Sequence, residues 1–308
     1  MIDSVASIAS AYVSLIPVTL AQSLMLSFVV LGIMIPFRVL NFPDLTSEGA
    51  YPLGGCVCAV SLLAGVPPAA ALLLAMLAGF LAGCTTAFIH LRFRIHTLLA
   101  GILMMTMLYS INLRIMGRSN LPVFNEATIF DLVPGGIAGA TVTKIIVAGV
   151  LAVLVFAVLR FYFLTERGTA TRAVGANPDM AEAQGINVWW ATIGGIGIAG
   201  SFSSLSGAIM IQSQGFADVG MGIGILINGL AALMIGEAVI GKKTVVRQLL
   251  APFVGAIIYY QLISVCLAAG MPPGDLKLAT GIFVLLMLAA PTLRGRSRGN
   301  VPRETMKE

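Results

Sequence analysis

Nine apolar stretches separated by polar connectors run along the chain from residue 15 to residue 292. A membrane-spanning helix needs about 20 mainly apolar residues. The pattern therefore predicts an all-α, polytopic membrane protein with about nine transmembrane helices (eight to ten), at 15–37, 49–65, 67–89, 97–116, 144–164, 190–212, 220–240, 249–269 and 275–292. The second and the last are short or contain glycine and proline, which is typical of tilted, broken or re-entrant spans.

The basic residues set the predicted orientation, because cytoplasmic connectors carry an excess of Lys and Arg. With nine spans and the N-terminus outside, only four of the 18 basic residues lie outside, at Arg114, Arg118, Lys144 and Lys277. The others lie inside, at Arg38, Arg92, Arg94, Arg160, Arg167, Arg172, Lys242, Lys243, Arg247, Arg294, Arg296, Arg298, Arg303 and Lys307. We therefore predict an N-terminus outside, a C-terminus inside and a cytoplasmic tail at 293–308.

Composition supports this class. Apolar residues make up 58% of the chain and charged residues 10%, whereas an ordinary globular domain is about 25% charged. This excludes a soluble enzyme, a nucleic-acid-binding domain and a disordered chain, and it leaves no room for a large soluble domain within 1–308. The first ten residues contain no Lys or Arg, so the first apolar stretch is predicted to be retained and not cleaved as a signal peptide.

Two glycine-rich motifs suggest nucleotide binding but do not fit it. Residues 195–200 spell GxGxxG within an apolar span, where close helix packing explains small residues better than a dinucleotide does. The pairs Gly79/Gly83 and Gly220/Gly224 are interpreted in the same way. Residues 236–244 almost spell a P-loop, but Lys243 stands where Ser or Thr must follow the first lysine. We therefore predict that this chain is not an enzyme and binds neither a cofactor nor a metal.

The connector at 165–189 predicts a short helix from Pro178 to Gln184. Asn177 is a good N-cap, proline suits the first helical position, and Gly185 can end the helix in a left-handed conformation. A helix this short needs a surface to pack on, and Met180, Ala181 and Ile186 are predicted to form a small apolar face. The helix either packs on its own protein or inserts into a cytoplasmic partner.

The same run, AVGANPDMAEAQGI at 173–186, resembles the coupling loop of type II ABC importer permeases. The branch is the branched-chain amino acid and ribose (simple sugar) permease family, and the resemblance extends over roughly 15–290. A second patch, LNFPDLTSEGAY at 40–51, is similar to the Asn-Phe-Ala-His-Gly…Gly-Ala-Tyr region of branched-chain permeases. Asp44-Leu45-Thr46 replaces His-Gly there, which is closer to a less characterised subgroup paired with amino-acid-type binding proteins and leaves the substrate class open.

The resemblance implies a division of labour between subunits. A cytoplasmic ATPase dimer would bind ATP and magnesium, a periplasmic or lipoprotein binding protein would deliver a small solute, and a second permease chain, identical or different, would complete the pathway. An amino acid is the favoured solute and a sugar comes next. The resemblance assigns ATPase coupling to the run around the short helix, at Asn177, Pro178, Met180, Ala181, Gly185 and Ile186, in a protein of the bacterial cytoplasmic membrane.

Polar residues within or beside the spans are candidates for the translocation pathway, because such residues usually face a bundle interior. They are Asn41, Asp44, Thr46, Glu48, Gln212 and Asn228. The alternative to a pathway role is a structural one for each residue: helix capping near the second span, an acid that pairs with Arg38, or a hydrogen bond between helices. A stand-alone secondary transporter, driven through Asp44 or Glu48, is the second hypothesis. An intramembrane enzyme is a remote third, because the chain offers no paired nucleophile and base.

Overall fold

The computed structural model describes residues 2–132, 139–276, 278–282 and 285. Helices dominate them: α1 (Ile2–Met34), α2 (Thr46–Leu63), α3 (Pro68–Phe93), α4 (Thr97–Met116), α5 (Gly139–Leu164), α6 (Glu166–Ala176), α7 (Pro178–Ala183), α8 (Val188–Gln214), α9 (Ile225–Ile240) and α10 (Val245–Ala268). A π-helical turn, η1 (Ile35–Val39), continues α1. Three 3-10 turns are short: η2 (Ile129–Leu132), η3 (Val219–Gly222) and η4 (Pro273–Asp275).

Seven segments within the described residues are long and apolar enough to span a membrane: Tyr12–Val39, Pro68–Phe93, Thr97–Met116, Gly139–Leu164, Val188–Gln214, Val219–Ile240 and Val245–Ala268. They confirm an all-α polytopic membrane protein. The predicted spans at 15–37, 67–89, 97–116, 144–164, 190–212, 220–240 and 249–269 correspond to them in order. The first helix begins earlier than predicted, because residues 2–14 contain no helix-breaking glycine or proline.

Two predicted spans remain. The span at 49–65 corresponds to α2, a helix of 18 residues that is buried over most of its length and is not among the seven segments. In the span at 275–292, residues 276, 278–282 and 285 are helical and the rest lie outside the described residues. The tail at 293–308 also lies outside them.

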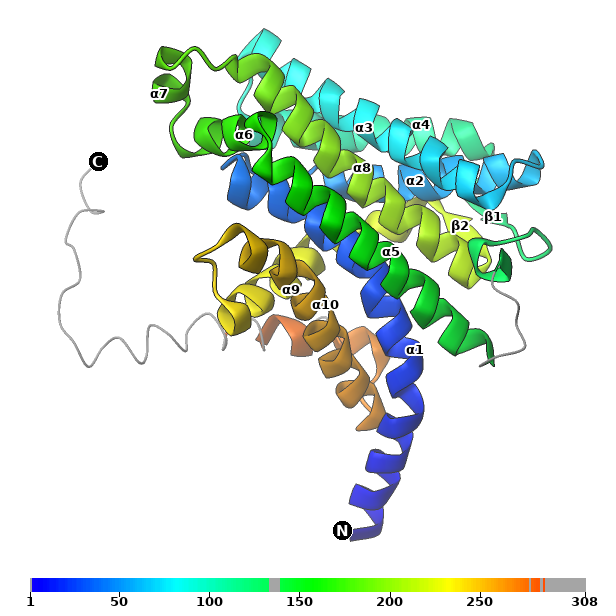
Figure 1. The fold of residues 1–308 in the computed structure, drawn as a ribbon. Helices are drawn as coiled ribbons and strands as arrows, with labels where there is room; N and C mark the ends of the chain where they lie inside the picture. The colour runs from blue at the N-terminus through cyan, green and yellow to red at the C-terminus, as the bar shows by residue number, and fades with distance from the viewer. Residues whose placement is uncertain (1, 133–138, 277, 283–284, 286–308) are drawn as a thin grey trace, which may run out of the picture.

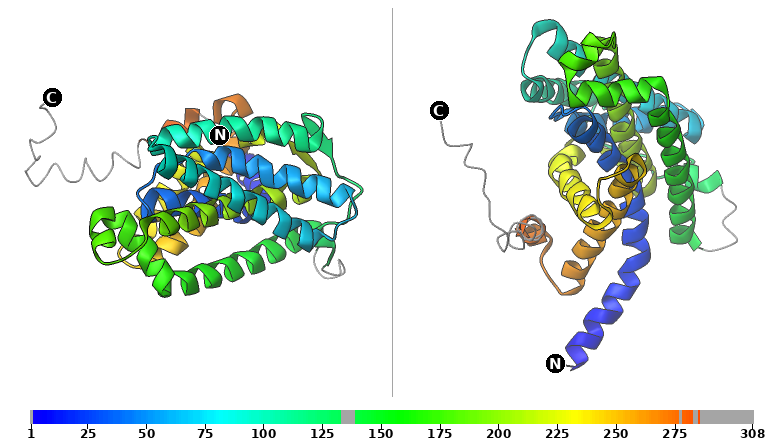
Figure 2. Two further views of the ribbon diagram at one scale, coloured as in Figure 1. Left: turned by 90° about the horizontal axis from the view of Figure 1, so that it is seen from above. Right: turned by 60° about the vertical axis from the view of Figure 1, so that its left-hand side comes forward.

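Helix α8 and the C-terminal part of α1 lie at the centre of the bundle, while the N-terminal part of α1 projects beyond it (Figure 1). Helix α8 contacts α1, α2 and α3, and α1 contacts α5, α9 and α10 as well. Helices α4 and α5 lie on opposite sides of the bundle when it is viewed from above (Figure 2). Many of the large apolar side chains on α3, α4 and α5 are exposed, as expected for helices that face lipid.

Glycines bring the central helices together backbone to backbone. A Cβ atom at Gly207 of α8 would overlap the carbonyl oxygen of Tyr51 in α2, and one at Gly32 of α1 would lie 2.7 Å from the carbonyl oxygen of Ala199 in α8. Cβ atoms at Gly236 of α9 and Gly255 of α10 would likewise overlap carbonyl oxygens of the facing helix. No side chain larger than hydrogen fits at these positions.

The small-residue motifs follow the same pattern in part. A Cβ at Gly200 of α8 would overlap the carbonyl oxygen of Gly79 in α3, and one at Gly83 would overlap that of Ile196. Close helix packing is therefore confirmed for residues 195–200 and for the pair Gly79/Gly83. The same prediction is wrong for Gly220 and Gly224. Gly220 lies in the 3-10 turn η3 and Gly224 precedes α9 with φ of +83°, so both belong to turns and not to a contact between helices.

Helices α6 and α7 lie at one end of the bundle, which we call the α7 end (Figure 1). At the opposite end, β1 (Asn120–Pro122) and β2 (Phe216–Asp218) form an antiparallel ribbon that pairs Leu121 with Ala217. Lys144 lies at this ribbon end, where its Nζ donates to the carbonyl oxygen of Ser213 at 2.7 Å.

Candidate functional site

Helix α7 is defined by a hydrogen-bonded motif at each terminus. At its start, Asn177 Oδ1 accepts a hydrogen bond from the Met180 amide at 3.0 Å. At its end, the Gly185 amide donates to the Glu182 carbonyl at 2.9 Å and the Ile186 amide to the Ala181 carbonyl at 3.0 Å, while Gly185 has φ of +82°. This is a Schellman motif. The predicted helix is confirmed, with its last residue at Ala183 and Gln184 as C-cap.

The faces of α7 differ from the prediction. Ala181 is 3% exposed and packs, together with Ile186, on a cluster formed by Leu40, Phe42, Val174 and Ile196. Met180, by contrast, is 62% exposed. The predicted common apolar face of Met180, Ala181 and Ile186 is therefore wrong, because two of its members fix α7 to its own protein. Met180 is the large apolar side chain of α7 that faces outward.

Helix α6 precedes α7 and was not predicted. Thr165 caps it, with its Oγ1 accepting a hydrogen bond from the Gly168 amide at 3.4 Å, and this Thr-Glu start was the available signal. A Cβ at Gly175 would overlap the carbonyl oxygen of Val39, the last residue of η1. Through this backbone contact, α6 lies directly on the end of α1.

The end of α1 is an irregular turn. In η1, the Leu40 amide donates to the Ile35 carbonyl at 3.1 Å, and the Phe42 amide donates to the Pro36 carbonyl at 2.8 Å. Asn41 follows with φ of +51°, a left-handed conformation that asparagine tolerates better than most residues. At the α7 end, α7 thus follows α6 along the chain, and α6 packs against the turn that ends α1.

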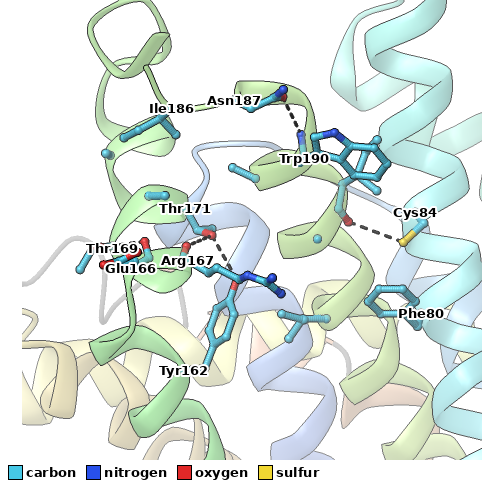
Figure 3. A pocket seen from close by; sticks show the side chains of 16 residues that line it. Phe80, Cys84, Tyr162, Glu166, Arg167, Thr169, Thr171, Ile186, Asn187 and Trp190 are labelled. Carbon is cyan, nitrogen blue, oxygen red and sulfur yellow. Dashed lines mark hydrogen bonds between the residues drawn. The ribbon is translucent and has the colours of Figure 1, made fainter. Parts of the chain in front are cut away.

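A cavity of about 1000 Å³ lies beside α6, between α5, α3 and the start of α8 (Figure 3). Its walls are mostly apolar and include Phe80, Ile186, Trp190, Ile193 and Ile198. Asn187 Oδ1 caps α8 at this point, accepting a hydrogen bond from the Trp190 amide at 3.2 Å. Helix α6 therefore reaches the bundle through η1, α5 and α8, and an apolar space separates it from α3.

The start of α2 is a buried, hydrogen-bonded junction. Asp44 is 2% exposed, and its Oδ1 accepts hydrogen bonds from the Thr46 amide at 2.9 Å and from the Thr46 hydroxyl. Thr46 Oγ1 also lies 2.8 Å from Thr86 Oγ1 of α3. Burial of this carboxyl, in the connector between α1 and α2, raises its pKa to about 6, although the hydrogen bonds from Thr46 lower it. The carboxylate closes a turn onto Thr46, the first residue of α2, while the N-cap position itself is Leu45.

Glu48 makes a hydrogen bond at the start of α9, and Arg38 makes an ion pair near its end. Glu48 Oε1 accepts a hydrogen bond from the Gly224 amide at the start of α9, at 3.0 Å. Near the other end, Arg38 pairs with Glu237 at 2.6 Å and Lys242 lies 3.8 Å from the same carboxylate. The acid that pairs with Arg38 is thus Glu237, and neither Asp44 nor Glu48 does so.

Gln212 and Asn228 make hydrogen bonds between elements. Gln212 Oε1 accepts from the Ile129 amide at 2.7 Å, and its Nε2 donates to Cys58 Sγ at 3.2 Å. Asn228 Oδ1 accepts from the Tyr259 hydroxyl at 3.0 Å, which joins α9 to α10.

Of the predicted pathway residues, Asp44 and Thr46 lie together, while Glu48, Gln212 and Asn228 lie at separate contacts. Asn41 is exposed in its turn. The described residues contain no group of three or more His, Cys, Asp or Glu side chains that would suit a metal ion.

We expect Asp44→Asn to leave the folded protein nearly as stable as the original, because an asparagine oxygen can accept both hydrogen bonds from Thr46. Asp44→Ala removes the acceptor of both hydrogen bonds from the buried Thr46 and should lower the unfolding free energy by about 1–3 kcal/mol. Thermal unfolding in mild detergent measures the difference between the two variants. A folded Asp44→Asn protein that no longer transports would instead show that the charge itself is needed.

Comparison with known proteins covers almost the whole chain. A sequence model of the family described as "Branched-chain amino acid transport system / permease component" matches residues 16–291. A tyrosine transport system permease protein of Clostridioides difficile is 38% identical over 274 residues, which are 89% of this chain and 90% of the relative. An uncharacterised protein of Rickettsia prowazekii is 32% identical over 275 residues, 88% and 95% of the two chains. No solved structure shows significant similarity to the chain.

Proposed function

Because this chain belongs to the family of branched-chain amino acid transport permeases, the membrane components of type II ABC importers, we propose that it carries a small solute inward by alternating access driven through α7. As a permease it is a multi-pass protein of the bacterial cytoplasmic membrane, and ATP hydrolysis belongs to a separate subunit. The observation that supports the proposal most is that the family match includes α7, a six-residue helix capped at both termini with Met180 exposed.

The proposed orientation places the α7 end in the cytoplasm, with nine spans and an outside N-terminus. The distribution of charge supports it. Arg38, Arg172 and Lys243 line one cavity at the α7 end, whereas Lys144 lies at the ribbon end. Connectors that the nine-span topology assigns to opposite sides thus lie at opposite ends of the bundle. An ATPase dimer that binds ATP and magnesium would then contact α7 from the cytoplasm.

We propose tyrosine or a related amino acid as the solute, delivered by a substrate-binding protein. The 38% identity to a protein named as a tyrosine transport permease supports this choice. A sugar is the second candidate within the resemblance stated above. Uptake of labelled tyrosine by cells that express the chain with its genomic ATPase and binding protein tests it, with phenylalanine, leucine and ribose as competitors. Uptake that only ribose suppresses would refute the amino acid assignment.

The pathway is proposed to lie between two copies of the permease. Within one chain, five of the six residues predicted for the pathway make hydrogen bonds to its own residues, as shown for Glu48 and Gln212, and Asn41 is exposed. The same contacts speak against a stand-alone secondary transporter, since the Asp44 carboxylate accepts two hydrogen bonds from Thr46. Crosslinking in native membranes followed by mass measurement tests whether the second copy is identical.

We expect Gly185→Val to uncouple ATP hydrolysis from transport without preventing membrane insertion. A residue with a branched side chain at φ of +82° is destabilised by about 1–2 kcal/mol, which is enough to unwind so short a helix. Nothing lies within 4 Å of a Cβ at this position, so the effect is conformational and not steric. Substrate-stimulated ATPase activity of the reconstituted complex is the measurement.

Gly185→Asn is the matched control, because asparagine adopts left-handed backbone conformations and ends helices in the same way. It should retain most of the stimulated activity. Normal stimulation in Gly185→Val would contradict the role of α7 in coupling.

A further inference from the structure

A second cavity, of about 440 Å³, lies at the α7 end between η1, α6 and the start of α10. Its walls are largely polar and carry three basic side chains, Arg38, Arg172 and Lys243. No acidic side chain is among the described residues that line it. We call it the basic cavity. It is distinct from the apolar cavity of Figure 3, although Thr169 and Ala173 of α6 border both.

Arg172 is the central feature of the basic cavity. Its Nε atom is buried and makes no hydrogen bond within the described part of the protein. An unsatisfied buried polar group costs about 1–3 kcal/mol, and more when the group is charged. Arg172 also borders a narrow crevice whose other lining residues include Met34, Phe163 and Leu249, so this residue lines both an apolar crevice and the basic cavity.

Lys243 and the start of α10 add positive potential to the basic cavity, whereas the last turn of α6, which contributes Gly175 and Ala176 to the wall, carries partial negative charge. Arg38 is paired with Glu237, but Lys243 makes no ion pair with any residue in the described ranges. Thr244 is the N-cap of α10, a helix of 24 residues whose start contributes Val245 to the wall. The start of a helix carries partial positive charge. Gln248 Nε2 donates to the Lys242 carbonyl at 3.1 Å, which holds the connector in place.

We propose that the basic cavity binds the phosphate group of a phosphate-bearing anion. A guanidinium presents paired donors that match two phosphate oxygens, and Arg172 and Lys243 together can neutralise the two negative charges of a phosphate monoester or the single charge of a phosphodiester. A cavity of about 440 Å³ has room for the phosphate and an organic substituent. The group can come from an anionic phospholipid headgroup or from a soluble phosphate ester.

Bound phosphate would bridge side chains from three elements. Arg172 belongs to α6, Lys243 to the α9–α10 connector, and Arg38 to η1. An anion held between them stabilises α6 against both α1 and α10. Occupancy would therefore favour one position of the α6–α7 unit, whether or not that unit binds an ATPase.

The experiment uses the full-length permease in nanodiscs of phosphatidylcholine and measures its thermal unfolding midpoint. One arm adds glycerol 3-phosphate against chloride of equal ionic strength, and the other replaces part of the lipid by phosphatidylglycerol. A ligand that binds only the folded protein raises the unfolding free energy by RT ln(1 + L/Kd), where L is the ligand concentration, so the unfolding midpoint rises with ligand concentration. We expect the midpoint to rise in at least one arm, and the responding arm identifies the source of the phosphate.

Arg172→Gln should weaken binding about tenfold or more and shift the response to correspondingly higher ligand concentration, because a charge-assisted hydrogen-bonded contact is lost. Lys243→Gln, an exposed position, gives the same test if Arg172→Gln does not fold. Arg247→Gln is the matched control, since it removes one charge nearby without altering the cavity lining. No shift in either arm, or an equal loss in Arg247→Gln, would overturn the proposal. Neither arm measures transport, so the result is independent of the proposed coupling.

Discussion

Gly175→Ala is expected to abolish coupled transport while the chain still inserts into the membrane. The added Cβ would overlap the carbonyl oxygen of Val39 and lie 2.8 Å from Leu40 Cα. Both are backbone atoms, so no side-chain rotation relieves the overlap. Overpacking in a tight site costs about 1–3 kcal/mol, and here the cost is avoided only if α6 moves away from η1.

The sign of the effect of Gly175→Ala distinguishes the α6–η1 contact from helix propensity. By helix propensity alone, alanine should stabilise α6 by about 0.8–1 kcal/mol relative to glycine. A loss of substrate-stimulated ATPase activity therefore reports the contact with η1 and not the helix itself. Gly149→Ala in α5 is the control, because no atom lies within 4 Å of its Cβ position. Unchanged transport in Gly175→Ala would show that the α6–η1 contact is not part of the coupling route.

Gly207→Ala is expected to cause the largest loss of stability. Its Cβ would overlap the Tyr51 carbonyl oxygen at the contact of α8 with α2, where Ser204 Oγ also donates to the Ala50 carbonyl at 2.7 Å. Both helices are buried there on several sides, so neither can retreat. We expect a loss of about 3 kcal/mol or more, measured as a lower unfolding midpoint and a reduced yield of folded protein.

The same helix provides the control for this prediction. Gly194, one turn and a half from the start of α8, has no atom within 4 Å of its Cβ position, so Gly194→Ala should be neutral or slightly stabilising. If both substitutions lowered the midpoint equally, the cause would lie in α8 itself and the argument from packing would fail.

The α7 helix was predictable because its signals are local. Asn177, Pro178 and Gly185 act through bonds to residues at most three or four positions away, and the sequence displays all of them. Helix α6 was missed because its sequence is polar and contains Gly168 and Gly175, residues that usually weaken helices. These glycines are required by contacts with Tyr162 and Val39, which only the folded chain brings close.

The pathway residues were harder to assign for a related reason. A polar residue in an apolar span must have a partner or a wet cavity, and the sequence does not distinguish the two. Gln212 meets Ile129 and Cys58, and Glu48 meets Gly224, each across a long separation in sequence. The ribbon of β1 and β2 was absent from the prediction because three-residue strands give no periodic signal.

The glycine contacts between backbones also bear on how the transporter moves. Where α1 and α8, α2 and α8, and α9 and α10 touch through main-chain atoms, neither sliding nor separation is possible without a large loss of packing. We therefore expect these described helices to move together as one body. If two copies form the pathway, as proposed above, the angle between the copies would set the width of the passage, and not a chamber within one copy.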